Sequence, residues 1–203
     1  MKYLSEKEAE EVLEKFGFNV VDREYCSKES KIPDILKRLG LPIVMKVSGE
    51  NIVHKKKLGG VNTDINNYAE ALNEFRRMKK MKGAKGVMFQ KKIDFNREFL
   101  VGVKKTEEFG HVILFGSGGS DVEEKKDVAF RVCPFSVEDV YDMFSEVKVM
   151  EGIGHKDQER IASFVLGMCD FVSKYSKIEE MDVNPMVLGG TGPIILDSRI
   201  LFG

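Results

Sequence analysis

The sequence lacks a long apolar run and an excess of charge of one sign. Its longest apolar runs, such as Val112-Ile113-Leu114-Phe115, are far shorter than the ~20 residues that a membrane helix needs. The 32 Lys and Arg residues are balanced by 33 Asp and Glu residues, and the net charge of −1 gives no support for nucleic-acid binding. Residues 1–11 are acidic and helical, so no signal peptide is expected. Neither a membrane protein nor a nucleic-acid-binding protein is therefore predicted.

Metal-binding side chains are also scarce. The cysteines are Cys26, Cys133 and Cys169, and no CxxC or HxxxH spacing joins them or the three histidines. A zinc site is not expected, because zinc ligands usually come in such pairs. Three widely separated cysteines are typical of reduced, buried thiols in a cytoplasmic protein, and this is the location that we expect.

Helical periodicities alternate with short strands that are joined by tight turns. This order favours an α+β fold with mainly antiparallel sheets. Helices are expected over residues 5–16, 32–39, 67–81 and 157–174 and after Ser136, and strands over 19–23, 42–48, 61–65, 87–91, 98–104, 112–115, 128–132, 178–188 and 193–201. Residues 82–86 resemble a hinge. The sequence therefore predicts a single domain of two lobes, about 1–85 and about 86–203.

Lys46 lies in the β-rich run 42–48, on the face opposite to Ile43, Met45 and Val47. A lysine in a strand either reaches solvent from an edge strand or meets an anion, because burying an unpaired ammonium is costly. Both interpretations stay open at this stage.

His54 is followed by Lys55–Lys57 and Gly59-Gly60. Glycines beside cations can form a phosphate pocket, and a neutral imidazole there could accept a phosphoryl group. A solvated loop is the alternative, since charge runs are usually exposed.

Gly116-Ser117-Gly118-Gly119 follows a strand, which suits phosphate binding but matches neither the P-loop nor the dinucleotide fingerprint. A surface loop is the alternative. Asp121 and Glu123 come directly after it, where they could orient a histidine or a metal-bound water.

The C-terminal run predicts a hairpin. If residues 189–192 form its loop, Leu188 pairs with Pro193, and Asn184 lies opposite Asp197. Carboxylate and amide oxygens suit Mg²⁺, whereas the alternative is a hairpin with polar residues turned to solvent.

Several blocks together resemble one family. Residues 46–61 match the pattern K-x-x-S-x-x-I-x-H-K…GGV of ADP-forming acyl-CoA synthetases. Further similar blocks follow in the same order at residues 98–103, 109–116, 118–131, 181–185 and 195–200. The resemblance is to the β subunit, which is an ATP-grasp domain related to the β subunit of succinyl-CoA synthetase.

This resemblance implies an ATP-grasp fold, in which two α+β lobes with mainly antiparallel sheets clasp ADP or ATP. The implied reaction converts acyl-CoA, phosphate and ADP to acid, CoA and ATP. It requires a CoA-binding α partner, in a heterotetramer, and passes a phosphoryl group through histidines.

Roles for individual residues are implied in the same way. His54 would carry the phosphoryl group, and Asn184 and Asp197 would hold Mg²⁺. The nucleotide would contact Lys46 through its phosphates, Gln90, Lys91 and Lys92 through its adenine, Glu98 through its ribose, and Gly116, Gly118 and Gly119 as a cover over the phosphates. Asp121 and Glu123 would contact an incoming phosphohistidine.

The chain departs from the family pattern at Lys55–Lys57, at Ser117 and Ser120, and at Gly152–His155, where the family often has an arginine. One alternative is therefore a degenerate, non-catalytic nucleotide-binding subunit. Another is an ATP-grasp ligase without a phosphohistidine, which His54-Lys55 argues against. The acid, the preference for ADP over GDP and the direction of the reaction stay open.

Overall fold

The computed structural model describes residues 1–49, 55, 57–120 and 122–203, which form two compact units. The larger unit contains residues 1–20 and 95–203, and the smaller unit contains residues 21–94. Strands pair antiparallel in both, which confirms the expected α+β class with mainly antiparallel sheets.

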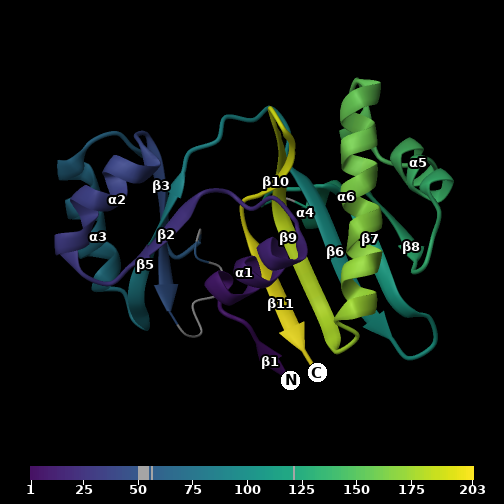
Figure 1. Ribbon diagram of the computed structural model, residues 1–203, viewed down its shortest axis with the longest axis horizontal. Coiled ribbons are helices and arrows are strands. Elements are labelled where there is room, and N and C mark those ends of the chain that lie inside the picture. The colour runs from purple at the N-terminus through teal and green to yellow at the C-terminus, as the bar shows by residue number, and fades with distance from the viewer. Residues whose placement is uncertain (50–54, 56, 121) are drawn as a thin grey trace. The chain divides into compact units, whose positions relative to one another are not determined.

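The described residues of the larger unit form a seven-stranded sheet in the order β1-β11-β9-β6-β7-β8, with β10 beside β9. Its strands are β1 (Lys2–Tyr3), β6 (Phe99–Thr106), β7 (Gly110–Ser117), β8 (Val128–Val132), β9 (Ile178–Gly189), β10 (Gly192–Ile195) and β11 (Ser198–Phe202). Its helices are α1 (Glu6–Phe16), α4 (Val122–Lys125), α5 (Val137–Ser145), the 3₁₀ helix η2 (Lys148–Met150) and α6 (His155–Lys174). Helices α1, α5 and α6 cover one face of the sheet (Figure 1).

The core of the larger unit lies under these helices. Alternate residues of β6, namely Phe99, Val101 and Val103, are buried there with Phe171 of α6. The intervening residues Leu100, Gly102 and Lys104 therefore belong to the opposite face, because successive side chains of a strand point to opposite sides. That second face carries the polar residues discussed below.

The N-terminal helix α1 packs on the larger unit. A capping box between Ser5 and Glu8 begins it, and Gly17, at φ 117°, ends it. Its apolar face includes Leu13, which is fully buried, and Phe16, whose ring centroid lies 5.2 Å from that of Phe171. Residues 1–20 therefore join the C-terminal part of the chain, which differs from the expected lobe of residues 1–85.

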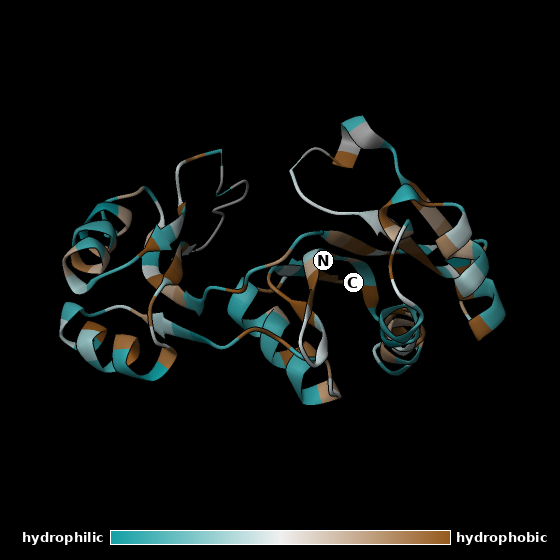
Figure 2. Ribbon diagram, turned by 90° about the horizontal axis from the view of Figure 1, so that it is seen from above, coloured by the Kyte–Doolittle hydropathy of each residue, from teal (hydrophilic) through white to brown (hydrophobic). Residues whose placement is uncertain are grey.

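The described residues of the smaller unit form a four-stranded sheet in the order β2-β5-β3-β4. Its elements are β2 (Arg23–Cys26), the 3₁₀ helix η1 (Glu29–Lys31), α2 (Ile32–Leu39), β3 (Ile43–Gly49), β4 (Val61–Ile65), α3 (Tyr68–Lys79) and β5 (Ala84–Lys91). Helices α2 and α3 bury their apolar residues against Met45, Val47 and Phe89. Both helices also carry hydrophilic residues, as expected when only one face is buried (Figure 2).

Three expectations about the elements need correction. The strand expected at 19–23 begins only at Arg23, and Val20 makes an isolated bridge to Ile195. The stretch 82–86 is not the hinge, because β5 already begins at Ala84 and the chain passes between the units at residues 94–95. The second arm of the C-terminal hairpin is divided into β10 and β11, although Leu188 pairs with Pro193 as expected.

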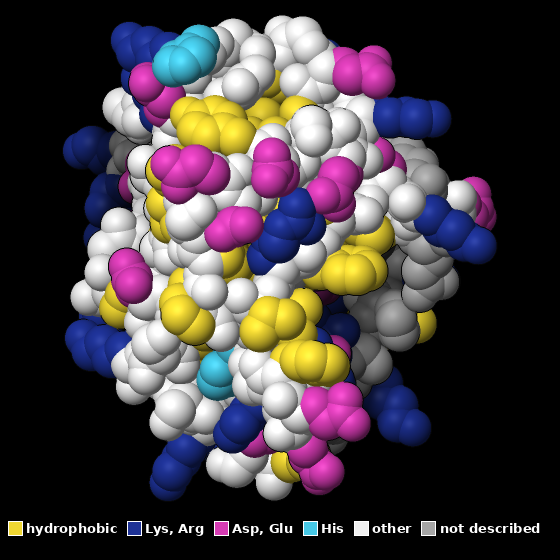
Figure 3. Space-filling model, turned by 90° about the vertical axis from the view of Figure 1, so that its right-hand side faces the viewer, with side chains coloured by type: hydrophobic (Ala, Val, Ile, Leu, Met, Phe, Trp, Pro, Cys, Tyr) yellow, Lys and Arg dark blue, Asp and Glu magenta, His cyan; other side chains and the backbone are white. Residues whose placement is uncertain are grey.

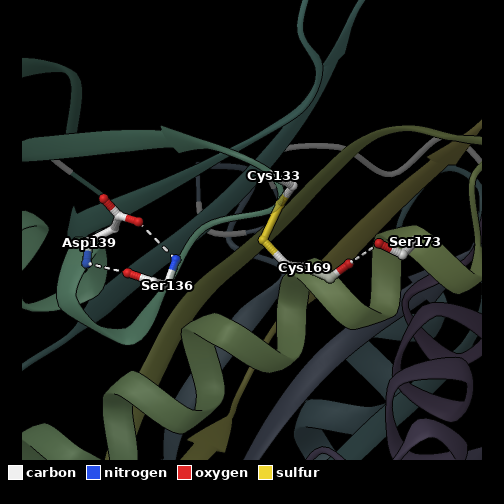
Figure 4. The surroundings of a disulfide bond; sticks show 5 residues. All are labelled: Cys133, Ser136, Asp139, Cys169 and Ser173. Carbon is white, nitrogen blue, oxygen red and sulfur yellow. Dashed lines mark hydrogen bonds between the residues drawn. A yellow bond between two sulfur atoms is a disulfide. The ribbon is translucent and has the colours of Figure 1, made fainter.

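The expectation of reduced thiols is wrong for two of the three cysteines. Cys133, just after β8, and Cys169, in α6, form a disulfide with a Cα–Cα distance of 5.8 Å (Figure 4). Their sequence separation of 36 residues gives no local signal, so only the packing of α6 against the sheet brings them together. Cys26 is a buried free thiol, as expected.

Some apolar side chains reach the surface of the larger unit. Phe109, Phe130 and Val132, from β8 and the turn before β7, are more than two-fifths exposed. Figure 3 shows apolar and acidic side chains interspersed on one face. Within the described residues, no helix combines the length and the apolar character that crossing a membrane requires.

Candidate functional site

Lys46 lies on the face of the smaller sheet that α2 and α3 do not cover. The register places Lys46 opposite Met88 and Val44 opposite Gln90, so Lys46, Met88 and Gln90 share this face. Strand β3 lies between β5 and β4, and Lys46 is only 6% exposed. The interpretation of Lys46 as an exposed lysine on an edge strand is therefore wrong.

Gln90 is 2% exposed, and its Oε1 has no hydrogen-bond partner among the described residues. A buried acceptor of this kind costs about 1–3 kcal/mol unless a donor is supplied. The two lysines that follow already lie near carboxylates: Lys92 Nζ is 3.1 Å from Asp64 Oδ1, and Lys91 Nζ is 3.9 Å from Asp22 Oδ2. The hydrogen bond from Lys92 lowers the pKa of Asp64. Of the three residues expected near an adenine, Gln90 alone is buried with unused hydrogen-bonding capacity.

His54 lies outside the described residues, so its position cannot be compared with the other candidates. The glycines after it are described. Gly60 N–H donates to Lys55 O at 2.7 Å, and Gly60 O accepts from Val47 N–H at 2.8 Å. A Cβ on Gly60 would lie 2.5 Å from Val47 Cγ1, so a glycine is needed for this close approach. The chain just before β4 is thus held against β3.

The glycine segment (Gly116–Gly119) begins at the end of β7. Ser117 N–H donates to Asp127 O at 2.9 Å, and Gly118 N–H donates to Glu98 O at 2.7 Å. A Cβ on Gly118 would lie 2.6 Å from Phe99 O. Close backbone contacts therefore explain the glycine, and the two N–H groups are bound within the protein.

Asn184 holds the last residue of the glycine segment at two points. Gly119 N–H donates to Asn184 Oδ1 at 2.8 Å, and Asn184 Nδ2 donates to Gly119 O at 3.2 Å. Asn184 N–H in turn donates to Asp197 O at 3.1 Å. The expected pairing of Asn184 with Asp197 is therefore confirmed, and it lies next to the glycine segment.

These oxygens fit a magnesium ion. The amide Oδ1 of Asn184 keeps a second lone pair beyond its bond to Gly119, and Asp197 supplies a half-buried carboxylate. The described residues contain no group of three or more His, Cys, Asp or Glu side chains that could hold a metal. Mg²⁺ needs no such group, since one or two protein ligands with phosphates and water commonly complete its shell.

Asp182 is a half-buried carboxylate that we did not choose as a site residue from the sequence. Burial raises its pKa to about 6, and Arg199 opposes this, whereas Asp197 and Glu180 add to it. It lines a cavity of about 380 Å³ on the uncovered face of the larger sheet, with apolar walls that include Leu100. The alternation with Asn184 along β9 was the available sequence signal, but it cannot reveal how deeply a side chain is buried.

The candidates therefore form two described sets. Hydrogen bonds bring Glu98, the glycine segment, Asn184 and Asp197 together in the larger unit. The smaller unit contains Lys46 and residues 90–92. Asp121 and the side chain of Glu123 lie outside the described part of the chain.

Known proteins share this arrangement of strands and motifs. The family model that describes an ATP-grasp domain matches residues 1–202. Acetate–CoA ligase [ADP-forming] II of Archaeoglobus fulgidus is 36% identical over 205 residues, which are 98% of this chain and 30% of that protein. Subunit beta of acetate–CoA ligase [ADP-forming] I of Pyrococcus furiosus is 32% identical over 213 residues, which are 98% of this chain and 91% of the subunit.

A solved structure gives the same result. The dinucleotide forming acetyl-coenzyme A synthetase 1 of Ca. Korarchaeum cryptofilum, in complex with coenzyme A, Ca-AMPCP and HgCl⁺, has a TM-score of 0.90 and 27% identity. The match covers all of this chain and 94% of that one. A second structure of that enzyme, with coenzyme A and Mg-AMPPCP, has a TM-score of 0.85, and its phosphohistidine segment points towards the nucleotide binding site.

These matches confirm the expected fold. The chain belongs to the ATP-grasp family, within the branch of the β subunits of ADP-forming acetate–CoA ligases. It spans less than a third of the length of the Archaeoglobus relative and nearly all of the Pyrococcus subunit.

Proposed function

We propose that this chain is the nucleotide-binding β subunit of an ADP-forming acid–CoA ligase. In the proposed reaction, acyl-CoA, phosphate and ADP are converted to acid, CoA and ATP. A CoA-binding α partner would carry out the steps at the thioester, and this chain would transfer the phosphoryl group to ADP. The relatives named as acetate–CoA ligases support this class of reaction.

One observation carries the proposal. Asn184 is held by both main-chain groups of Gly119, and its N–H donates to the main-chain oxygen of Asp197. An amide oxygen suited to a divalent cation thus adjoins the glycine segment, on a residue that pairs with a carboxylate-bearing one. Phosphoryl transfer depends mainly on positioning and on neutralising charge. A cation site next to a segment that can cover phosphates meets both needs.

The residues of the chain would then divide the work. Lys46 would contribute positive charge to the nucleotide phosphates, and Gln90 would accept a hydrogen bond from the base. Glu98 would contact the ribose. A bound Mg²⁺ would neutralise phosphate charge, with Asn184 and Asp197 as its protein ligands.

The proposed chemical step is transfer from His54 to ADP. An oxygen of the β-phosphate of ADP forms a new P–O bond, and the N–P bond of the phosphohistidine breaks. The electron pair of that bond returns to the ring, and a proton on the other ring nitrogen of the phosphohistidine leaves the imidazole neutral. The support for His54 is the motif around it and the phosphohistidine segment of the Korarchaeum enzyme, which points towards the nucleotide binding site of that protein.

The partner and the location belong to the same proposal. Relatives that are named as β subunits imply an α subunit, and we propose a heterotetramer of the two. We also propose that the reaction takes place in the cytoplasm, where ADP and CoA are found. The identity of the acid would be set by the α partner.

Labelling with γ-labelled ATP and Mg²⁺ tests the proposal. We expect acid-labile, base-stable label on wild type and none on His54→Ala, and loss of ATP formation from acyl-CoA by the His54→Ala complex with its α partner. His155→Ala is the matched control, because the His155 side chain is 79% exposed. Full activity of His54→Ala in the complex would remove His54 from the mechanism. Nucleotide binding without activity in any complex would favour the degenerate, non-catalytic subunit.

A further inference from the structure

Asp127, just before β8, is the centre of the hydrogen bonds that hold the glycine segment. Its carboxylate accepts from Ser117 Oγ at 2.6 Å, from Lys148 N–H at 2.7 Å and from Val149 N–H at 2.9 Å. Its main-chain oxygen accepts from Ser117 N–H. One residue thus ties the glycine segment to η2, which is distant in sequence.

The carboxylate of Asp127 carries a negative charge, which suits it to accept these hydrogen bonds. Burial raises the pKa of Asp127, but the hydrogen bonds from Ser117, Lys148 and Val149 outweigh burial, and the pKa lies below its ordinary value. The group is therefore ionised at neutral pH. Hydrogen bonds to a charged acceptor are shorter and stronger than neutral ones, so these contacts are rigid.

The glycine segment also approaches the main chain of Asp127 closely. A Cβ on Gly116 would lie 2.0 Å from Asp127 O and 2.8 Å from Val128 Cα. Backbone atoms cannot move aside as the end of a side chain can. Gly116 and the main chain of Asp127 are therefore held in close contact where β7 and β8 pair.

A second contact closes the network around the segment. Arg97 Nη1 donates to Val149 O at 2.6 Å. Arg97 directly precedes Glu98, whose carbonyl oxygen accepts from Gly118 N–H. The segment is thus held on one side by Asp127 and on the other by the chain that enters β6.

The opposite end of the glycine segment reaches the candidate cation site. Gly119 contacts both polar atoms of the Asn184 amide. These two contacts orient the amide so that its Oδ1 faces Gly119 N–H. The remaining lone pair of Asn184 Oδ1 is therefore oriented by the position of the segment. Partners that orient a metal ligand typically change metal affinity 10–100-fold when they are removed.

We infer that Asp127 is a positioning residue for the divalent cation: through Ser117 it fixes the glycine segment, and through Gly119 it orients the amide oxygen of Asn184. The hydroxyl of Ser117, which donates to Asp127, has a defined task in this chain. The inference rests on the proposed function, because it assumes that nucleotide binds with a divalent cation.

Calorimetric titration of the purified 203-residue chain with ADP, at increasing Mg²⁺ and in EDTA, tests this inference. For Ser117→Ala, the Mg²⁺ concentration that gives half of the maximal gain in ADP affinity should rise about threefold to tenfold, and for Asp127→Asn about tenfold. Ser117→Thr keeps the hydroxyl and should match wild type. Affinity for ADP in EDTA should be the same in all variants, because only the cation ligand is disturbed.

Ser136→Ala is the control for a purely structural role. Ser136 caps α5 through reciprocal bonds with Asp139 (Figure 4), so this variant loses stability without touching the glycine segment. Its Mg²⁺ dependence should equal that of wild type.

The outcomes separate this inference from the proposed function. If wild type binds no nucleotide under any condition, the proposed function fails and this inference falls with it. If wild type gains ADP affinity with Mg²⁺ but Ser117→Ala and Asp127→Asn behave like wild type, or if Ser136→Ala shifts as much as they do, the positioning role alone is overturned.

Discussion

In the larger unit, polar side chains of the candidate site are hydrogen-bonded within the protein: the amide of Asn184 bonds to both main-chain groups of Gly119, and the carboxylate of Asp127 accepts from three donors. In the smaller unit, Gln90 Oε1 is buried without a partner among the described residues. A disulfide cross-links the larger unit, whereas Cys26 in the smaller unit is a free thiol. The candidate residues Asn184 and Asp127 of the larger unit are thus held by contacts within the protein, whereas Gln90 of the smaller unit keeps an acceptor that a ligand would satisfy.

Removing the disulfide of the larger unit should have the largest of the expected effects on stability. Replacing both Cys133 and Cys169 by Ser should lower the free energy of unfolding by ~4 kcal/mol, because the disulfide joins residues with a sequence separation of 36 and so restricts the unfolded chain. Urea unfolding of the variant measures the loss. Wild type in reductant should behave like the variant. A loss below about 1 kcal/mol would show that the cross-link does not rigidify the larger unit.

The glycine segment should tolerate no side chain at its start. Gly116→Ala should cost about 3 kcal/mol, because the new Cβ would meet backbone atoms of Asp127 and Val128. Gly102→Ala is the matched control in the neighbouring strand β6, since its Cβ would make only an ordinary 3.5 Å contact with Leu114. Thermal unfolding compares the two. Equal losses would contradict the tight packing inferred for the segment.

The contrast between satisfied and unsatisfied polar groups can be tested by paired substitutions. Asn184→Leu should cost ~2 kcal/mol, because it leaves the N–H and C=O groups of Gly119 without partners. Gln90→Met should be neutral or stabilising by up to ~1 kcal/mol, since it removes a buried acceptor that has no donor among the described residues. Urea unfolding without nucleotide gives both values. A large loss for Gln90→Met would break the comparison.

The smallest expected effect depends on pH. Because the pKa of Asp127 is held below its ordinary value, its ionised form stabilises the fold at neutral pH. That stabilisation is present above the unfolded value of about 4 and is lost as the pH falls through the lowered pKa. Asp127→Asn should therefore lower the free energy of unfolding by about 1 kcal/mol at pH 7. The loss is small because solvent screens the charge at this half-buried position.

Stability measured against pH checks this last prediction. The difference between wild type and Asp127→Asn should shrink steadily below about pH 4. Asp139→Asn serves as a comparison, because the carboxylate of Asp139 caps α5 away from the glycine segment. A difference that does not change with pH would mean that the charge of Asp127 is unimportant for stability.

Local features of the fold and of the candidate site could be predicted from the sequence. The period of two along residues 43–47 placed Lys46 on the face opposite to its apolar neighbours. The loop at 189–192 defined the register that sets Asn184 beside Asp197. Both depend on alternation and turn length, which are local properties. The same reasoning found the glycine segment as a candidate from its composition.

Features that need distant parts of the chain were missed. The packing of α1 on the larger unit, the disulfide and the contact of Asp127 with Lys148 and Val149 all join residues that are far apart in sequence. Asp127 had no motif of its own, because an acceptor of main-chain N–H groups can be placed by the fold alone. The desolvation that raises the pKa of Asp182 could not be predicted either, because it depends on which neighbours surround the strand.

The way in which the glycine segment uses its main chain has a consequence for selectivity. The N–H groups of Ser117, Gly118 and Gly119 all donate to acceptors inside the protein. Unlike the amides at the start of a long helix, they offer no seat for a naked anion. Orthophosphate or sulfate without a metal would therefore gain nothing from this segment, and the larger unit would select ligands that arrive with their own counter-cation.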